Sequence, residues 1–555
     1  MPPQQITQNT LFYGDNLPIL REHVPTASID LIYLDPPFNS SRSYNVLFAD
    51  ESGKESEAQI TAFEDTWHWD KSASRTYHEL IQNGPLNVVK MIGALHDFIG
   101  ENQMMAYLVM MATRLVELHR VLKPTGSLYL HCDPTASHYL KIVLDTIFGP
   151  ENFANEIIWK RTTAHGDARQ GSQHFGRIHD IILRYTKTAD FVWNQQYVPY
   201  GQEYMDTYYK YIDENGRRYW KDNLTAAKPG GDTRYEWKGK LPPPNRYWAF
   251  SKTNMERLEA EGRIVYSSTG VPMYKRYLDE MLGKPVQDIW DDIRGLGGLG
   301  HKKEERLGYP TQKPVALLER IVQASSNPGD LVLDPFCGCG TAIAAAQKLD
   351  RRWIGIDITY LAISLQKNRL KGSFDLVHKR DYVVIGEPED LHDAEQLARD
   401  NRYQFQWWAV SLVGAKPLGG DQGSKTGKKG KDRGIDGVIN FVEDKGKPKR
   451  VLVQVKSGKV NSGLIRDLRG TVEREDAAIG VFITLEPPTK DMEREAFSAS
   501  FYRSELWQND YQRIQILTIS QLLAGAEVQM PSPHGTFKQA QRVRKTEGLQ
   551  SDFGM

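Results

Sequence analysis

Five consecutive residues near the start of the chain, Leu34-Asp35-Pro36-Pro37-Phe38, combine groups that could hold a flat, amine-bearing substrate. The Asp35 carboxylate can accept hydrogen bonds from an exocyclic amine, and the Phe38 ring can stack on the face of a nucleobase. The two prolines cannot donate to a strand ladder and restrict the backbone before them, so they end the preceding strand in a rigid turn. This stretch predicts a nucleobase site, with an ordinary junction between strand and loop as the alternative.

A second stretch, residues 330–341 (DLVLDPFCGCGT), has the composition of a ligand-binding turn. An apolar strand runs into glycines that let the backbone approach a ligand, and a helix expected from Ala342 presents unpaired N–H groups. Asp357 ends the next apolar strand, about twenty residues beyond the turn, where nucleoside-binding α/β folds place a carboxylate for ribose hydroxyls. A third glycine is missing, so this is not the dinucleotide fingerprint.

The elements that must position both turns are buried strands of a parallel sheet. Residues 29–33 (IDLIY) and 331–333 (LVL) are short, mostly apolar, β-rich runs. Helical spacing of apolar residues over 102–121 and a strand over 127–133 extend the α/β pattern. Open α/β sheets bind ligands at the carboxyl ends of their strands, which is where both turns lie.

Taken in order, these motifs resemble the β-class of amino-directed DNA methyltransferases, in which the Asp-Pro-Pro-Phe motif precedes the S-adenosylmethionine motif. Further matches are Gly14-Asp15, residues 155–160 (NEIIWK), residues 288–290 (DIW) and residues 309–314 (YPTQKP). The resemblance covers residues 6–385. It implies an α/β, Rossmann-like, S-adenosylmethionine-dependent methyltransferase with an inserted target-recognition region.

The resemblance also implies residue roles. Asp35 and the carbonyl of Pro36 would bind the target amine beside Pro37, and Phe38 would stack on the extruded base. Asp15 would lie near the cofactor adenine, although a helix N-cap explains this residue equally well. The full set implied for S-adenosylmethionine is Asp15, Thr311, Lys313, Pro314, Asp334, Pro335, Phe336, Gly338, Gly340, Thr341 and Asp357.

The target implied is double-stranded DNA, read by residues 161–304. This region is dense in aromatic and basic residues, as in 217–221 (RRYWK), which suits phosphate contacts and base stacking. A poorly patterned structural insertion is the alternative. Adenine N6 is favoured over cytosine N4, because N4 enzymes of this family more often carry Ser at the position of Asp35.

A different pattern follows residue 388. Asp436 precedes one expected hairpin strand, while Gln454 and Lys456 lie two residues apart, and so on one face, of the other. An acid, a second oxygen ligand and a lysine can hold Mg²⁺ and orient water for phosphodiester attack. The pattern resembles the Mrr-type branch of the PD-(D/E)xK nucleases, which implies that Asp436 and Gln454 bind metal and that Lys456 assists the attack. A DNA-binding module that does not cut is the alternative.

Length and composition set the remaining expectations. The 555 residues exceed one domain, and we expect 1–160 and 305–388 to form the methyltransferase, 161–304 the recognition region, 389–525 a smaller α/β restriction-endonuclease-like domain and 526–555 a polar tail. Lys plus Arg and Asp plus Glu both total 70, so net charge does not indicate a nucleic-acid partner.

Targeting signals and further cofactor motifs are missing from the sequence. Three cysteines form neither a disulfide framework nor a zinc spacing, and neither a signal peptide nor a membrane-spanning run is found. We therefore expect a cytoplasmic protein without a membrane partner. No ATPase motif occurs, so ATP is not expected, and a homodimer is left open.

The sequence thus predicts a site-specific DNA adenine-N6 methyltransferase fused to a Mg²⁺-dependent endonuclease, as in restriction–modification. Three alternatives remain: a cytosine-N4 methyltransferase, a defence nuclease that senses modification, and a methyltransferase with a non-cutting C-terminal DNA-binding module.

Overall fold

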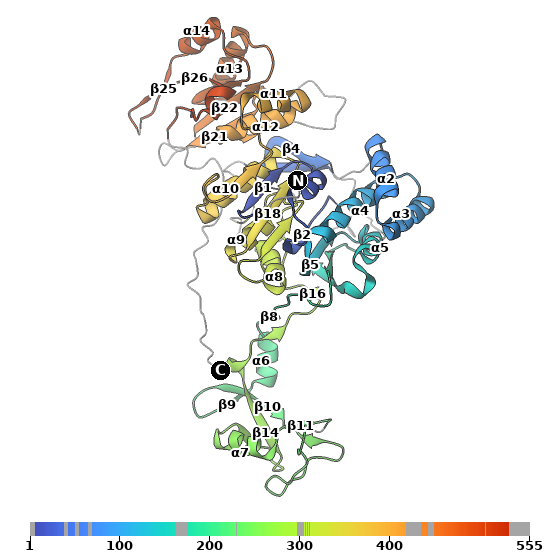
Figure 1. Cartoon of the computed structure of the whole chain (residues 1–555). Helices are drawn as coiled ribbons and strands as arrows, with labels where there is room; N and C mark the ends of the chain where they lie inside the picture. The colour runs from blue at the N-terminus through green and yellow to red at the C-terminus, as the bar shows by residue number, and fades with distance from the viewer. Residues whose placement is uncertain are drawn as a thin grey trace. The chain divides into compact units, whose positions relative to one another are not determined.

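The computed structural model describes residues 6–37, 43–49, 55–64, 69–162, 173, 175–228, 230–296, 305, 307, 309, 311–417, 434–441, 449–505 and 507–531, with backbone alone for 43–49 and 55–64. The chain forms two compact units (Figure 1). One comprises Met1–Asn194 with Asp288–Met555, and the other is Gln195–Gln287. Each unit has hydrophobic clusters of its own.

The larger unit contains a mixed sheet whose strand order differs from the order of the chain. Nine of the described strands form it, in the order β16-β6-β7-β5-β2-β17-β18-β1-β19. Their bounds, in that order, are Ile289–Trp290, Phe153–Lys160, His179–Thr186, Leu122–Cys132, Ile29–Leu34, Leu331–Asp334, Arg352–Asp357, Thr10–Tyr13 and Val383–Ile385. The pairs are parallel except those that β7 makes with β5 and β6. The fold is the α/β, Rossmann-like arrangement that the sequence predicted.

Asp30 links two distant segments at the centre of this sheet. It lies in β2 and is only 8% exposed. Its carboxylate accepts from the backbone N–H of Leu331 at 2.9 Å and from Lys123 Nζ at 2.8 Å. Charge-assisted hydrogen bonds are among the stronger ones in proteins, so this group ties β2 to β17 and to β5.

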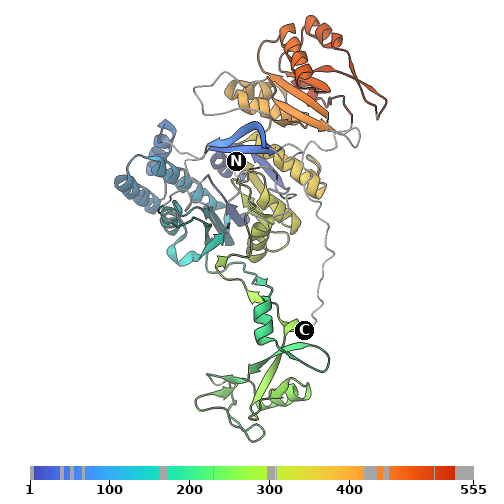
Figure 2. The ribbon, with the colours of Figure 1, turned by 180° about the vertical axis from the view of Figure 1, so that it is seen from behind.

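Helices cover both faces of the sheet (Figures 1 and 2). The elements on one side are α1 (Asn16–His23), α2 (Lys71–Asn83), α3 (Leu86–Ile99), α4 (Gln103–Val121) and α5 (Ser137–Phe148), and those on the other are α8 (Val315–Ser325), α9 (Thr341–Lys348) and α10 (Tyr360–Phe374). Helix α4 begins after Asn102, whose side chain accepts from the N–H of Met105 at 3.0 Å. Met105 and Met111 are fully buried in the core, as the helical spacing of apolar residues predicted.

The compact unit that interrupts this fold is shorter than the recognition region expected at 161–304. Strand β7 lies between β5 and β6 in the large sheet, and β16 pairs with β6. The apolar residues of β7 are buried by these neighbours, so residues 179–186 belong to the large sheet and precede the compact unit, which begins at Gln195. The compact unit Gln195–Gln287 thus lies within the predicted recognition region, and the bounds of the part that would contact DNA stay a prediction.

That smaller unit is built on four described strands in the order β13-β14-β10-β9. Their bounds are Ile264–Tyr266, Pro272–Tyr277, Arg218–Asn223 and Tyr211–Ile212. Trp237 and Trp248 form its core with Met255 of helix α7 (Lys252–Ala260). It is thus a packed structure, although its sequence is poorly patterned.

The C-terminal part of the larger unit has a second sheet. Five of the described strands form it in the order β20-β21-β22-β23-β26, with bounds Lys416–Pro417, Gly437–Phe441, Lys449–Lys456, Ile479–Thr484 and Ile514–Thr518. Val451 and Val453 of β22 pack in one cluster with helix α12 (Arg402–Leu412), whereas Leu452 packs in another with α13 (Ser462–Arg474) and α14 (Lys490–Ser498). This alternation is the strand pattern that the sequence predicted.

No helix in the described ranges is both long enough and apolar enough to cross a membrane.

Candidate active site

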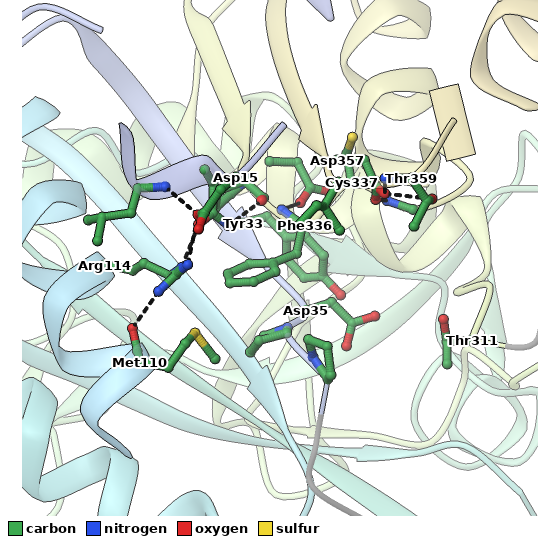
Figure 3. A pocket seen from close by; sticks show the side chains of 18 of the residues that line it. Asp15, Tyr33, Asp35, Met110, Arg114, Thr311, Phe336, Cys337, Asp357 and Thr359 are labelled. Carbon is green, nitrogen blue, oxygen red and sulfur yellow. Dashed lines mark hydrogen bonds and ion pairs between the residues drawn. The ribbon is translucent and has the colours of Figure 1, made fainter. Parts of the chain in front are cut away.

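A cavity of about 590 Å³ lies at the carboxyl ends of β1, β2, β17 and β18 (Figure 3). Parallel strands end at one edge of a sheet, so turns that are distant in sequence meet there. The predicted site residues that line this cavity are Asp15, Asp35, Pro36, Pro37, Thr311, Lys313, Asp334, Pro335, Phe336, Gly338, Thr341 and Asp357. The Asp-Pro-Pro turn at residues 35–37 and the glycine turn at residues 337–340 therefore open into one space.

Three other residues predicted for this site are not among the described residues that line the cavity. Phe38 lies outside the described residues. Pro314 precedes α8, and among the described cavity-lining residues neither it nor Gly340 is found. Gly340 has φ +73°, and a Cβ there would lie 2.8 Å from Gln366 Cγ. Its glycine is therefore required by the left-handed backbone and by close packing beneath the turn, not by contact with the cavity.

The Asp357 carboxylate orders the glycine turn and the start of α10. Its Oδ2 accepts from the backbone N–H of Gly338 at 2.9 Å. Its Oδ1 accepts from both the N–H and the hydroxyl of Thr359 at 2.9 Å. Burial raises the pKa of this carboxyl group, and the hydrogen bonds only partly oppose that rise.

Asp334 is a second buried acid of the cavity. It ends β17 and accepts from the backbone N–H of Phe336 at 3.1 Å. Burial raises the pKa of Asp334 well above its usual value, and the nearby charges of Asp35 and Asp357 raise it further. Five aspartates line this cavity among the described residues (Asp15, Asp35, Asp70, Asp334 and Asp357), and this set favours a ligand that carries positive charge.

Arg114 of α4 was not predicted as a site residue, yet it lines the cavity. Its Nη2 donates to Asp15 Oδ1 at 2.7 Å and its Nε donates to Asn16 Oδ1 at 2.5 Å. Asn16 donates in turn to the carbonyl of Pro335 at 2.8 Å. Asp15 also caps α1 through Leu17 N–H at 2.9 Å, so the two interpretations of this acid are both compatible with its position. The sequence feature that could have indicated Arg114 is its position as a charged residue in the middle of an otherwise largely apolar helix.

The carboxylate of Asp35 forms an ion pair with the ammonium group of Lys313. The two side chains are 15% and 10% exposed, so water screens this pair only in part. Lys313 also donates to the carbonyl of Thr311 at 3.4 Å. The segment before α8 thus places a cation directly on the acid of the Asp-Pro-Pro turn.

Comparison with known families agrees with this geometry. Residues 29–366 match the family model N6_N4_Mtase, described as DNA methylase, which is more than half of the chain. The chain belongs to this DNA methylase family.

Several curated proteins resemble the chain. Type II methyltransferase M.EcaI of Enterobacter cloacae is 35% identical over 257 residues, which are 46% of this chain and 56% of that protein. The StyLTI Mod subunit of a type III restriction-modification enzyme of Salmonella typhimurium is 26% identical over 364 residues, 62% of this chain and 50% of that protein. DNA adenine methyltransferase YhdJ of Escherichia coli is 24% identical over 362 residues, 65% of this chain and 82% of that protein. The chain therefore spans about half the length of the first two relatives.

Ion pairs inside the smaller unit involve several of the basic residues expected to contact DNA. Arg217 bonds to Asp279 and Glu280, each at 2.8 Å. Arg218 bonds to Asp206 at 3.0 Å. These two arginines of the RRYWK stretch hold the unit together, so their positive charge is partly balanced within the unit.

The residues predicted to hold Mg²⁺ lie near one another in the C-terminal sheet. Asp436 Oδ1 accepts from Gln406 Nε2 at 2.5 Å, and Asp436 Oδ2 accepts from the backbone N–H of Val455 at 2.6 Å. Gln454 is buried, and its Oε1 is without a hydrogen-bond partner among the described residues. Lys456 ends β22 two residues later.

This donor set does not fit Mg²⁺ well. Hard divalent cations take several oxygen ligands, usually with more than one carboxylate. Here Asp436 already accepts from two donors, and Gln454 offers one neutral oxygen. In the described part of the chain no group of three His, Cys, Asp or Glu side chains could hold a metal. Residues 421–524 match the family described as NACHT-associated inactive Restriction Endonuclease 1, so the nuclease-like region is confirmed at the level of fold family.

Proposed function

We propose that the chain is a DNA methyltransferase that methylates an exocyclic amine of a base in double-stranded DNA, using S-adenosylmethionine. The observation that carries this proposal is the single cavity shared by Asp35 and the glycine turn at Gly338. An acceptor for an amine and a site for a nucleoside cofactor must meet for direct transfer. Membership of the DNA methylase family supports the same conclusion.

The cavity has the features that S-adenosylmethionine needs. Its volume lies within the usual range for small-molecule sites, and buried acids suit the ammonium and sulfonium charges of this cofactor. Asp15 and Asp357 would bind adenine and ribose, and Gly338 would allow close approach of the backbone. When bound, the cofactor supplies an electrophilic methyl group.

The protein's part in the reaction is to position the amine and raise its reactivity. The lone pair of an aromatic amine is conjugated with the ring, which makes it a poor nucleophile. Hydrogen bonds from the amine to the Asp35 carboxylate and the Pro36 carbonyl would draw the nitrogen toward tetrahedral geometry. Positioning of this kind can account for much of the acceleration. Because Lys313 contacts Asp35, an incoming amine must share or displace that ion pair.

We propose adenine N6 as the acceptor. The acid at position 35, rather than Ser, favours adenine within this family, and YhdJ, one of the relatives, is an adenine methyltransferase by name. Cytosine N4 remains the alternative, since the same turn could hold either amine.

Methyl transfer from labelled S-adenosylmethionine to mixed-sequence DNA, without Mg²⁺ and followed by nucleoside analysis, tests the proposal. We expect label in N6-methyladenine. Label in N4-methylcytosine would keep the mechanism and reverse the base. No label in any nucleoside, with the cofactor still bound, would contradict the proposal and favour a defence protein that senses modification.

For the C-terminal part we propose a nuclease-like module that does not cut DNA. The engaged oxygens of Asp436 and the match to an inactive endonuclease family support this alternative over a Mg²⁺-dependent nuclease. Its role in a restriction–modification system would then be binding instead of cleavage.

Incubation of the full chain with Mg²⁺ and plasmid DNA, both unmethylated and premethylated by the protein, tests this module. We expect no cleavage of either substrate, and the same result for Lys456→Ala. Mg²⁺-dependent cleavage that disappears in Lys456→Ala would restore the nuclease interpretation.

A further inference from the structure

A row of buried polar side chains crosses the large sheet behind the catalytic turn. Tyr33 of β2 is 2% exposed, His131 of β5 is 0% exposed and Asp180 of β7 is 3% exposed. Tyr33 pairs with Tyr129 of β5, two residues before His131, and His131 pairs with Ile182, two residues after Asp180. Because side chains alternate along strands, Tyr33, His131 and Asp180 share one face of the sheet.

The contacts along this row are continuous. The Tyr33 hydroxyl lies 2.9 Å from His131 Nδ1, and His131 Nε2 lies 3.2 Å from Asp180 Oδ2. Asp180 Oδ1 lies 3.3 Å from Arg161 Nε, at the partly exposed end of the row. The Trp159 ring meets the His131 ring edge-on at 5.5 Å and helps to fix its plane.

The direction of the hydrogen bonds follows from the chemistry of the groups. An ionised carboxylate only accepts, so in the neutral form of His131 the Nε2 atom donates to Asp180. Its Nδ1 then carries a lone pair, to which the Tyr33 hydroxyl donates. Asp180 thereby selects one tautomer of His131, as partners of functional histidines commonly do.

The far end of the row lies in the active site. Tyr33 lines the cavity two residues before Asp35 (Figure 3). Burial raises the pKa of the Tyr33 hydroxyl well above its usual value, and the charges of Asp35, Asp334 and Asp180 raise it further. Tyr33 is therefore a neutral group beside the carboxylates of the Asp35 and Asp334 turns.

We propose that His131 and Asp180 are positioning residues for methyl transfer, which hold Tyr33 in the wall shared by the Asp35 and Asp334 turns. The inference rests on the proposed methyltransferase function and extends it to two residues that lie outside the cavity. We expect the loss of either partner to lower activity about tenfold or more, because misplacing a reacting group by about 1 Å can cost about a hundredfold.

A double-mutant cycle on the turnover number separates positioning from general damage. We expect Tyr33→Phe and His131→Leu each to lower kcat about tenfold or more, and the double variant to be no slower than the slower single variant. His131→Asn offers an amide oxygen near the position of Nδ1 and should recover part of the loss. Binding of S-adenosylhomocysteine, measured by calorimetry, should stay within about threefold in each folded variant. The proposal would be overturned if the fold-losses in kcat of the two single variants multiplied in the double variant, or if Tyr33→Phe left kcat unchanged.

Tyr129→Phe is the matched control. Tyr129 is fully buried, pairs with Tyr33 in the sheet and bonds through its hydroxyl to Ser325 at 2.7 Å, without lining the cavity. The Tyr129→Phe variant loses a similar hydrogen bond on the same face of the sheet, but at a residue outside the cavity. We therefore expect its kcat to lie within about twofold of that of the unaltered chain. A loss equal to that of Tyr33→Phe would assign the effect to the fold and overturn the proposal.

A spectroscopic measurement decides the arrangement independently of activity. The ¹⁵N signals that vanish in His131→Asn should show a neutral ring protonated at Nε2, and Asp180→Asn should disturb them. A His131 ring protonated at Nδ1 would contradict the proposed hydrogen bonds of the row, even if the enzyme were active. If the unaltered chain transfers no methyl group while this tautomer is present, the proposed function fails and the positioning role for methyl transfer fails with it, leaving only the hydrogen-bonded row.

Discussion

Asp35→Ala is expected to lower methyl transfer by about a thousandfold, with cofactor binding almost unchanged. Asp35 supplies the charged acceptor in the Asp-Pro-Pro turn, and alanine leaves the target amine without it. The neighbouring acids Asp334 and Asp357 bond to the backbone of the glycine turn, so neither can replace it. Single-turnover transfer from labelled S-adenosylmethionine measures the loss, and calorimetry with S-adenosylhomocysteine checks the cofactor site.

Asp35→Asn is the matched control for this substitution. The amide retains the shape and one acceptor oxygen but loses the charge that pairs with Lys313. We expect transfer between those of the unaltered chain and Asp35→Ala. If Asp35→Ala retained a tenth of the activity, the carboxylate would not be the group that activates the amine.

Asp357→Ala is expected to weaken the binding of S-adenosylmethionine about a hundredfold or more. The carboxylate lines the cavity and also orders Gly338 and Thr359, so its removal disturbs the ligand contact and the turn together. Hydrogen bonds to charged groups contribute about 1.5–3 kcal/mol each. The loss of two such bonds between the Asp357 carboxylate and the ribose hydroxyls of the cofactor accounts for a hundredfold weaker affinity. Calorimetric titration with the cofactor measures the affinity.

Two features keep the Asp357 result interpretable. Thr359→Val removes one donor to Asp357 but leaves the carboxylate, so we expect a loss of only about tenfold. Burial raises the pKa of Asp357. Ionisation of this acid therefore destabilises the unliganded fold once the pH rises above the pKa that an aspartate has in the unfolded chain. Asp357→Ala also leaves the N–H of Gly338 and the N–H and hydroxyl of Thr359 without this acceptor, so thermal unfolding of the empty protein is measured beside the affinity. Unchanged affinity would remove Asp357 from the cofactor site.

The parts of the site that could be predicted lie where strands end. Asp35, Asp334 and Asp357 each follow an apolar run, and the rule that parallel strands end at one edge brings them together without any knowledge of partners. Local sequence therefore contained the necessary information.

The parts that could not be predicted depend on partners far along the chain. Arg114 lies in a helix whose spacing indicates only core packing, and its contacts with Asp15 and Asn16 appear once the helix is placed. His131 lies in an apolar strand, and its partners Tyr33 and Asp180 come from two other strands. No spacing rule connects such residues.

The C-terminal part shows the opposite difficulty. The spacing of Asp436, Gln454 and Lys456 predicted a metal site, and the strands do bring these residues near one another. Whether a carboxylate can bind metal depends on its other contacts, and those of Asp436 come from Gln406 and from the backbone of Val455. Short motifs of this kind predict which residues lie near one another better than they predict whether those residues bind metal.

The adjacency of β2 and β17 has a consequence for how the protein is made. Strand β2 carries the catalytic turn, yet its neighbour β17 leaves the ribosome about 300 residues later. At about 5–20 residues per second, this delay lasts roughly 15–60 s. During that time β2 has a bare apolar edge and Asp30 lacks the N–H of Leu331. The Asp-Pro-Pro turn therefore gains its second neighbouring strand only after residue 334 has emerged, and we expect the nascent chain to depend on chaperones until then.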